Sequence, residues 1–258
     1  MNGEKIRWCA IGDSFTYLDS HIEASGYRIT KAYLTRVVEQ IPNLVLTNIG
    51  MDGSRTGDWI DRPLPEADLY TILLGTNDWG WGVPCGTKQD FDQKRSGTVL
   101  GNLGILIQNI QKRNPQARII VMNPIERTDF VYVGGNEMLT PGSYAPRAGQ
   151  WLCDISKAIY ETCTQSGINN LYAVNLHDRS GITPANAMKW KRVWTGTAYE
   201  NLPYPDYLSI PDDPVPKEHP YPVEAVGWTY DGLHPSDAGN QLIADILADE
   251  IKNIYGGI

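Results

Sequence analysis

Five short apolar runs alternate along the chain with longer amphipathic segments. The apolar runs, each about the length of a β-strand, lie at 6–11, 44–49, 69–74, 117–122 and 170–176. The amphipathic segments, in which apolar residues recur at helical spacing, lie at 29–41, 99–113, 149–165 and 235–254. Because the runs are apolar almost throughout, they are typical of strands buried on both faces of a parallel sheet. The alternation therefore predicts an α/β fold, a three-layer α/β/α sandwich around a central, mainly parallel five-stranded sheet.

The length and composition favour a single domain. The 258 residues are 41% hydrophobic and 20% charged, as in an ordinary globular protein. We expect one domain over 1–258 that carries a long insertion at about 177–230. This insertion is too long and too rich in proline and aromatic residues to be a plain connection, and its sequence indicates irregular structure.

The net charge and the lengths of the apolar segments argue against nucleic-acid and membrane partners. The formal net charge is −8 and no run of Lys or Arg offsets it, so we expect no nucleic-acid partner. No apolar stretch approaches the roughly 20 residues of a membrane span, so we expect no membrane partner. Residues 1–5 lead directly into the first strand, which indicates a cytoplasmic protein as written, or a secreted or periplasmic one whose signal peptide was removed.

The four cysteines lack the paired spacing of a zinc site. We therefore expect neither a metal ion nor another cofactor. The sequence leaves the oligomeric state open.

Polar, glycine-containing turns lie where the predicted strands end. They cover 12–14, 50–53 and 75–78 after the first three strands, and a fourth, 231–234, precedes the last helix. In open α/β sheets the ligand site lies outside the carboxyl ends of the strands. We therefore expect the four turns to converge on one edge of the sheet.

Ser14, in the first of these turns, is a candidate nucleophile for acyl transfer through an acyl-enzyme. A serine hydroxyl needs a base to remove its proton, and the usual base is a histidine oriented by a carboxylate. Of the four histidines, only His234 lies on a turn into a helix with an aspartate, Asp231, three residues before it. The alternative is purely structural: both segments are ordinary turns, Ser236 caps the last helix, and His234 is exposed.

Acyl transfer also needs hydrogen-bond donors aimed at the developing oxyanion. The Gly50 N–H and the Asn77 side-chain amide follow the second and third strands, and with the Ser14 N–H they could form a three-donor hole. The structural alternative is that Gly50 permits a tight turn and Asn77 bonds to its own loop.

Together the four turns resemble the sequence blocks of the SGNH hydrolases, also called GDSL-type esterases and lipases. The matching residues are Gly12-Asp13-Ser14, Asn48-x-Gly50, Gly75-x-Asn77-Asp78 and Asp231-x-x-His234, in the family's order, and the resemblance extends from about Ile6 to Ile254. It implies a flavodoxin-like fold and the hydrolysis of an ester. It also implies that Ser14 is the nucleophile, His234 the base and Asp231 its orienter, with Gly50 and Asn77 as oxyanion donors. Phe15 stands where the older motif name has leucine, a structural position.

Aromatic residues around the predicted site indicate a carbohydrate substrate. Trp and Tyr have flat apolar faces with a polar tip, which suits stacking on sugar rings, and the chain has eight Trp and fourteen Tyr but only three Phe. The likeness is thus greatest to carbohydrate acetylesterases, which remove an acetyl group from a sugar. The candidate substrate-binding residues are Asp13, Trp79, Trp81, Trp190 and Trp194.

Other readings stay open. The aromatic residues could instead be buried to hold the insertion. The enzymatic alternative is a short-chain esterase, lysophospholipase or thioesterase, because this fold hosts many substrates. The non-enzymatic alternative is a carbohydrate-binding module that has lost turnover.

Overall fold

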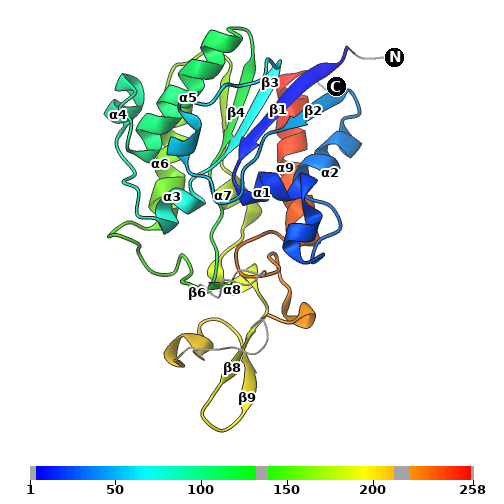
Figure 1. Ribbon diagram of the computed structural model, residues 1–258, viewed down its shortest axis with the longest axis vertical. Coiled ribbons are helices and arrows are strands. Elements are labelled where there is room, and N and C mark those ends of the chain that lie inside the picture. Colours follow the sequence, from blue (N-terminus) through cyan, green and yellow to red (C-terminus); the bar gives the residue numbers. More distant parts are fainter. Residues whose placement is uncertain (1–3, 132–138, 212–220, 257–258) are drawn as a thin grey trace.

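A five-stranded sheet forms the centre of the computed structural model, which describes residues 4–131, 139–211 and 221–256 (Figure 1). The strand order is β2-β1-β3-β4-β7, and every neighbouring pair is parallel. The strands are β1 (Ile6–Gly12), β2 (Leu44–Asn48), β3 (Leu69–Leu73), β4 (Arg118–Met122) and β7 (Leu171–Val174). Each lies within two residues of a predicted run, so the parallel five-stranded sheet is confirmed.

Two pairs of helices cover the two faces of the sheet. Helices α2 (Tyr33–Gln40) and α9 (Asp237–Ile254) lie on one face, and α5 (Val99–Arg113) and α6 (Leu152–Thr164) lie on the other (Figure 1). Because side chains alternate along a strand, Trp8 and Ala10 of β1 pack with the first pair, whereas Cys9 and Ile11 pack with the second. The three-layer sandwich is therefore confirmed.

The order of the strands reverses beside β1. The chain passes from β1 outward to β2 and then returns to β3 on the opposite side of β1, so the strand order reverses between β1 and β3. Ligand sites of such sheets lie at the carboxyl ends of the strands at this reversal. Ser14 follows β1 and Asn77 follows β3, so both lie at the carboxyl ends of the strands at this reversal.

The predicted insertion has more regular structure than its sequence indicates. It contains α7 (Leu176–Ser180), α8 (Pro184–Ala187), the hairpin of β8 (Lys191–Trp194) and β9 (Tyr199–Leu202), and the 3₁₀ helices η4 (Asp206–Ser209) and η5 (Val223–Ala225). The hairpin turns through Gly196, whose φ of +96° suits glycine, and it projects away from the sheet (Figure 1). The expectation of irregular structure is wrong here, because four-residue strands are too short to give a clear alternating pattern.

Short elements complete the described part of the chain. They are α1 (Ser14–Tyr17), η1 (Leu18–Ser20), η2 (Ile22–Ser25), η3 (Thr56–Trp59), α3 (Thr76–Gly80), α4 (Lys88–Gln93), β5 (Phe130–Val131) and β6 (Leu139–Thr140). Within the described ranges, none of the helices has the length and apolarity needed to cross a bilayer.

Candidate active site

The turn after β1 presents the Ser14 hydroxyl at the start of α1. Asp13 caps this helix, since its carboxylate accepts a hydrogen bond from the Phe15 N–H at 3.1 Å. A Cβ on Gly12 would lie 2.0 Å from Thr16 Oγ1, so only glycine permits α1 to fold this closely onto the strand. The result is a sharp strand-to-helix turn with Ser14 at its tip.

Ser14, His234 and Asp231 are joined by consecutive hydrogen bonds. The Ser14 Oγ lies 2.9 Å from His234 Nε2, and His234 Nδ1 lies 2.7 Å from Asp231 Oδ2. With Nδ1 donating to the carboxylate, Nε2 is left to accept the serine proton. The structure therefore brings together the three residues that the sequence suggests for nucleophile, base and orienter.

The turn that carries His234 is held by hydrogen bonds to the Asp231 carboxylate and by contact with a neighbouring segment. Asp231 Oδ1 accepts from the backbone N–H of Leu233 at 3.0 Å and of His234 at 2.7 Å. Gly232 has a φ of +98°, and a Cβ there would lie 1.9 Å from the Asp129 carbonyl oxygen. Only glycine allows this contact, so the turn is fixed against the segment that follows β4.

The environment of His234 favours its protonated form. Burial of the imidazole, the largest effect, opposes protonation, but the carboxylates of Asp231, Asp52 and Asp13 together outweigh it, and the pKa of His234 is raised above its ordinary value. Three aromatic rings surround the imidazole: Phe15 at 5.8 Å, Phe130 at 5.3 Å, and Tyr230, which stacks on it at 5.7 Å. These rings restrict the imidazole to the orientation that faces Ser14.

Asn77 lies half-buried in α3, directly after β3. Its Nδ2 donates to the Ser54 carbonyl oxygen at 3.1 Å, which uses one of its two N–H groups. The next residue, Asp78, is buried and accepts from the Thr56 N–H at 3.0 Å and the Thr56 hydroxyl at 2.6 Å. These two bonds fasten η3 to α3 and thereby fix the position of Asn77.

The expectation that Gly50 supplies an oxyanion donor is wrong. The Gly50 N–H donates to Asn48 Oδ1 at 2.9 Å and is therefore already committed. A Cβ on Gly50 would lie 2.6 Å from the Tyr17 backbone nitrogen, so glycine is needed for the close approach of this turn to α1. Gly50 thus has a structural role.

Gly53, three residues further along the same turn, is the better candidate donor. It is exposed, and within the part of the chain that the structure describes its N–H donates no hydrogen bond. Its φ of +68° turns the backbone beside Asp52, which lines a small pocket together with Ser14 and His234. The sequence contains both glycines but does not indicate which N–H is already bonded.

That small pocket at Ser14 is lined mainly by residues that the sequence did not single out. Its lining consists of Ser14, Tyr17, Leu18, Ala24, Asp52, Tyr230, Asp231 and His234. Tyr17, Leu18 and Ala24 come from the segment after the first turn, which has no motif that could have marked them. In the described residues, no group of three or more His, Cys, Asp or Glu side chains is placed to hold a metal ion.

Two of the predicted substrate-binding residues are buried. Trp79 is 0% exposed, and its Nε1–H donates to the Gln150 carbonyl oxygen at 2.8 Å. Asp13 is also buried and is engaged in capping α1, and burial raises its pKa to about 7. The predictions that these two side chains contact substrate are therefore wrong, because tertiary packing covers both.

The other three tryptophans differ in exposure. Trp81 is 73% exposed beside the Arg55 guanidinium, and Trp194 is 42% exposed on the hairpin, where its ring lies 5.1 Å from Tyr199. Trp190 is half-buried and packs against a small cluster that includes Met188 and Tyr221. Trp81 and Trp194 thus offer ring surface to a ligand, whereas Trp190 mainly holds the insertion.

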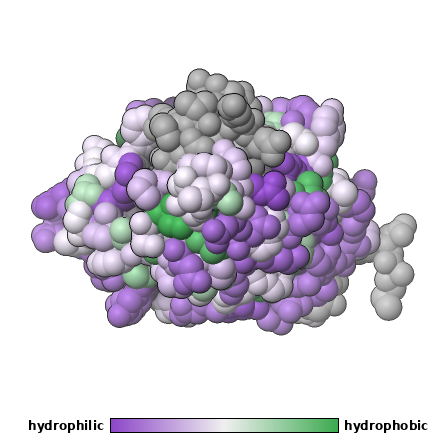
Figure 2. All heavy atoms as spheres, turned by 90° about the horizontal axis from the view of Figure 1, so that it is seen from below, coloured by the Kyte–Doolittle hydropathy of each residue, from purple (hydrophilic) through white to green (hydrophobic). Residues whose placement is uncertain are grey.

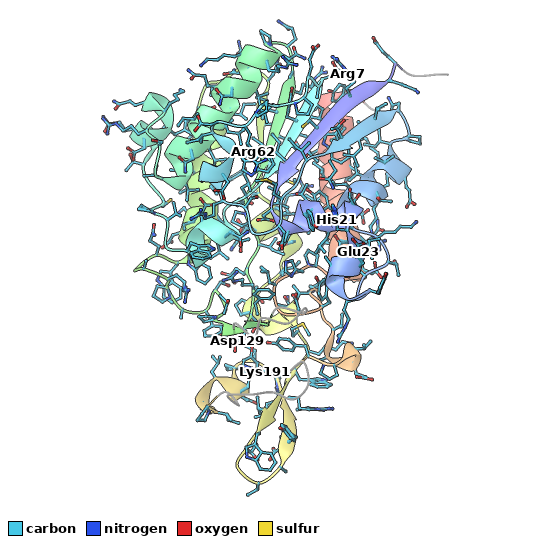
Figure 3. The ribbon with its side chains drawn as sticks, viewed as in Figure 1. Arg7, His21, Glu23, Arg62, Asp129 and Lys191 are labelled. Carbon is cyan, nitrogen blue, oxygen red and sulfur yellow. The ribbon has the colours of Figure 1, made fainter. Side chains whose placement is uncertain are left out.

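A buried ion pair anchors the insertion next to the turn that carries His234. Lys191 Nζ of β8 lies 3.1 Å from Asp129 Oδ2, with both side chains almost fully buried (Figure 3). The Tyr144 hydroxyl also donates to this carboxylate, and the Tyr221 hydroxyl donates to the Asp129 carbonyl oxygen at 2.9 Å. Because that carbonyl also contacts Gly232, the base of the hairpin is fixed relative to His234.

Known proteins resemble this chain in sequence and in fold. A family model described as the GDSL-like lipase/acylhydrolase family matches residues 10–242. The crystal structure of a possible lipase from Chitinophaga pinensis DSM 2588 is 37% identical, with a TM-score of 0.92, and the match covers 97% of this chain and 99% of that one.

More distant structures share the fold alone. A protein from Lactobacillus plantarum is 20% identical, with a TM-score of 0.63 and coverage of 98% of this chain and 99% of that chain. A carbohydrate esterase family 3 from Talaromyces cellulolyticus is 15% identical, with a TM-score of 0.55 and the same coverage, 98% and 99%. No curated protein sequence matches the chain.

Proposed function

This chain belongs to the GDSL-like lipase/acylhydrolase family, and we propose that it is a serine ester hydrolase that removes a short acyl group, an acetyl group, from a carbohydrate. The observation that carries the proposal is the hydrogen-bonded sequence Asp231–His234–Ser14 at the carboxyl end of β1. A non-catalytic binding module has no need for this alignment of carboxylate, imidazole and hydroxyl.

In the proposed reaction, His234 Nε2 takes the Ser14 proton while Ser14 Oγ attacks the ester carbonyl carbon. The N–H groups of Ser14 and Gly53 and the second N–H of Asn77 donate to the oxyanion of the tetrahedral intermediate. Its collapse breaks the bond to the alcohol oxygen, which receives the proton from His234, and leaves an acyl-enzyme on Ser14. A water molecule, deprotonated by His234, then attacks this ester, the bond from the acyl carbon to Ser14 Oγ breaks, and Ser14 takes the proton back from His234 as the carboxylic acid leaves.

The surroundings of Ser14 support a short acyl group on a polar alcohol. The pocket is small, and the face that carries the hairpin is mostly hydrophilic, with apolar residues only in small separate areas (Figure 2). A long acyl chain would need a continuous apolar groove, because each buried methylene contributes only about 0.8 kcal/mol. Trp81 and Trp194 offer flat, exposed rings on which a sugar could stack.

The second candidate is a short-chain esterase or lysophospholipase. It is favoured by the relative from Chitinophaga pinensis, which is described as a possible lipase. The two candidates differ in how the rate depends on acyl chain length.

A series of p-nitrophenyl esters from acetate to octanoate separates the candidates. An acetyl pocket should lose kcat/KM by butyrate, because added methylenes have no room. A rise in kcat/KM through octanoate would contradict the carbohydrate proposal and support the lipid one. Mass spectrometry of acetylated oligosaccharides incubated with the protein would then identify the sugar that loses its acetyl group.

The proposed sugar platform is tested by Trp194→Ala. Removal of one stacked ring should lower kcat/KM for an acetylated oligosaccharide about 5- to 30-fold, mainly through KM, and should leave p-nitrophenyl acetate unaffected. The matched control is Trp151→Ala, because Trp151 is 41% exposed but lies outside the insertion, at the start of α6. Equal effects of the two substitutions would contradict a platform on the hairpin.

A further inference from the structure

A groove of about 510 Å³ lies beside the turn that carries His234 and has no part in the proposed reaction. Its volume is within the range of about 300–1,000 Å³ that small-molecule sites occupy. The small pocket at Ser14 has a volume of only about 10 Å³. The groove is therefore large enough to hold a ligand such as a sugar unit, which the small pocket is not.

Two segments of the chain border both the groove and the small pocket. The first contributes Ala24 to the pocket and Arg28 to the groove. The second contributes Tyr230 to the pocket and Trp228 to the groove. An antiparallel bridge keeps this second segment extended, and in an extended chain side chains two positions apart point to the same side. Both cavities therefore lie along the same side of this segment.

Two positive charges line the groove without a carboxylate partner. Arg28 is half-buried, and its Nη1 donates to the Tyr221 carbonyl oxygen at 3.2 Å. Lys189 is exposed. Within the part of the chain that the structure describes, no ion pair joins either side chain to an acidic residue. Both cations are thus available to an anionic ligand.

The carboxylate in the lining does not neutralise these charges. Asp237, at the start of α9, is paired with Arg36 Nη2 at 2.6 Å. It also accepts a hydrogen bond from the Thr30 backbone N–H at 3.0 Å. Because Arg36 balances Asp237, the groove keeps the positive charge of Arg28 and Lys189 in a protein of net charge −8.

An aromatic ring and two apolar side chains lie in the same lining. Trp228 is half-buried and packs against the core between the sheet and helices α2 and α9. Val223 is 66% exposed, and Val226 is half-buried. A flat indole ring with apolar neighbours suits the face of a sugar, and cations suit an anionic substituent on that sugar.

We infer that the groove binds an acidic sugar unit, one that bears a carboxylate or a phosphate, at a distance from the ester that is hydrolysed. Arg28 and Lys189 bind the anionic group, and the sugar ring lies against Trp228. The inference rests on the proposed carbohydrate substrate and adds the charge that this carbohydrate carries. A uronic acid and a sugar phosphate share this chemistry, and the experiment distinguishes them.

Three sugars that differ only at C6 test the inference: methyl glucoside, methyl glucuronide and methyl glucoside 6-phosphate. None contains a carboxylic ester, so binding is measured without turnover. NMR titration of the isotope-labelled protein gives the three dissociation constants, and the indole N–H signal of Trp228, assigned with Trp228→Phe, reports where the sugar binds.

We expect one charged sugar to bind about 5- to 30-fold more tightly than the neutral sugar and to shift the Trp228 signal. The sugar that does so identifies the anionic group as carboxylate or phosphate. The preference should shrink in about 1 M NaCl, where the Debye length falls to about 3 Å. Equal binding of the three sugars, no binding, or binding that leaves the Trp228 signal unchanged would overturn the inference.

The double variant Arg28→Gln/Lys189→Gln should bind the charged and neutral sugars equally. The control is Lys112→Gln/Arg113→Gln, which removes the same two positive charges from the exposed end of α5, on the other face of the sheet. This control should keep the wild-type preference. A loss of the preference in both double variants, or in neither, would overturn the assignment of the groove.

Lys189→Gln alone provides a second test in case the double variant does not fold. The Lys189 side chain is exposed and forms no hydrogen bond or ion pair in the described ranges, so its replacement leaves the fold intact. The preference for the charged sugar should fall in this variant as well. An unchanged preference would count against a role of Lys189 and overturn the inference as stated.

Failure of the proposed function gives a different result. If the protein hydrolyses no ester at all, p-nitrophenyl acetate included, the proposed function is wrong, and the sugar titrations still decide whether the groove binds an acidic sugar. If acetylated sugars are hydrolysed but the three C6 variants bind equally or not at all, the proposed function stands and the inference alone is wrong.

Discussion

Replacement of Asn77 by alanine should slow the chemical step far more than it destabilises the fold. Asn77 is half-buried at the start of α3, and one of its two amide N–H groups donates to the Ser54 carbonyl oxygen at 3.1 Å. The other N–H is the proposed donor to the oxyanion. The substitution therefore removes two hydrogen bonds, one present in the resting protein and one formed only during the reaction.

The two losses have different magnitudes. Loss of one oxyanion donor lowers kcat by about 10² to 10³, or roughly 3–4 kcal/mol, and changes KM little because the donor acts on the transition state. Loss of the bond to Ser54 should lower the free energy of unfolding by about 1 kcal/mol. For a chain of this size that corresponds to a fall in Tm of roughly 2–4 °C.

Asn109→Ala is the matched control. Asn109 is also half-buried, and its Nδ2 donates to the Ile60 carbonyl oxygen at 2.7 Å, but it lies on α5 away from Ser14. Steady-state kinetics with p-nitrophenyl acetate and calorimetric melting of both variants provide the comparison. We expect similar losses of Tm and a large loss of kcat in Asn77→Ala alone. A kcat equal to that of the control, or a rise in KM alone, would refute the role of Asn77.

Three further predictions follow from burial and charge. The acid limb of the pH profile of kcat/KM should have a midpoint above about 6.5, because the pKa of His234 is raised and the base must be neutral; a lower midpoint would count against His234. Asp13→Asn should stabilise the protein more at about pH 8 than at about pH 5. Burial raises the pKa of Asp13 to about 7, so the contribution of Asp13 to stability is full below about pH 4 and is lost as the pH rises through about 7. Asparagine keeps the cap on α1 without a charge at either pH. Equal shifts in Tm at the two pH values would contradict this. Trp79→Ala should lower the free energy of unfolding by about 3–5 kcal/mol, since the ring is fully buried. A denaturant titration that shows almost no loss of stability would contradict the burial of Trp79.

The framework of the fold was predictable because each element has a local signature. Strands buried on both faces are apolar throughout, and the covering helices have one apolar face, so the five strands and four long helices are visible in the sequence. Parallel strands share one carboxyl edge, so Ser14 and His234 could be expected to meet although 220 positions separate them.

Features that depend on distant segments could not be predicted. Trp79 and Trp81 are two residues apart in similar sequence, yet Trp79 is covered by Arg127 and Gln150 and Trp81 is exposed. Nothing within the local sequence distinguishes them, because exposure is decided by segments that follow β4. The same holds for Asp129 and Lys191, whose contact across 62 positions fixes the hairpin beside the site.

Gly50 and Gly53 differ in whether the backbone N–H is free to donate to an oxyanion, and only hydrogen-bond geometry distinguishes them. Both glycines lie in one turn after β2, and both fit a close backbone approach. Only the structure indicates that Asn48 already accepts from the Gly50 N–H, whereas the Gly53 N–H has no acceptor in the residues described.

The most direct test of the account is to trap the acyl-enzyme. The protein is mixed with p-nitrophenyl acetate, quenched in acid within the first turnover, digested and analysed by peptide mass spectrometry. We predict that the peptide containing Ser14 gains the mass of one acetyl group, that the label disappears after turnover, and that His234→Ala strongly slows its formation. Full turnover with no label on Ser14, or with the label on another residue, would contradict the assignment of Ser14 as the nucleophile.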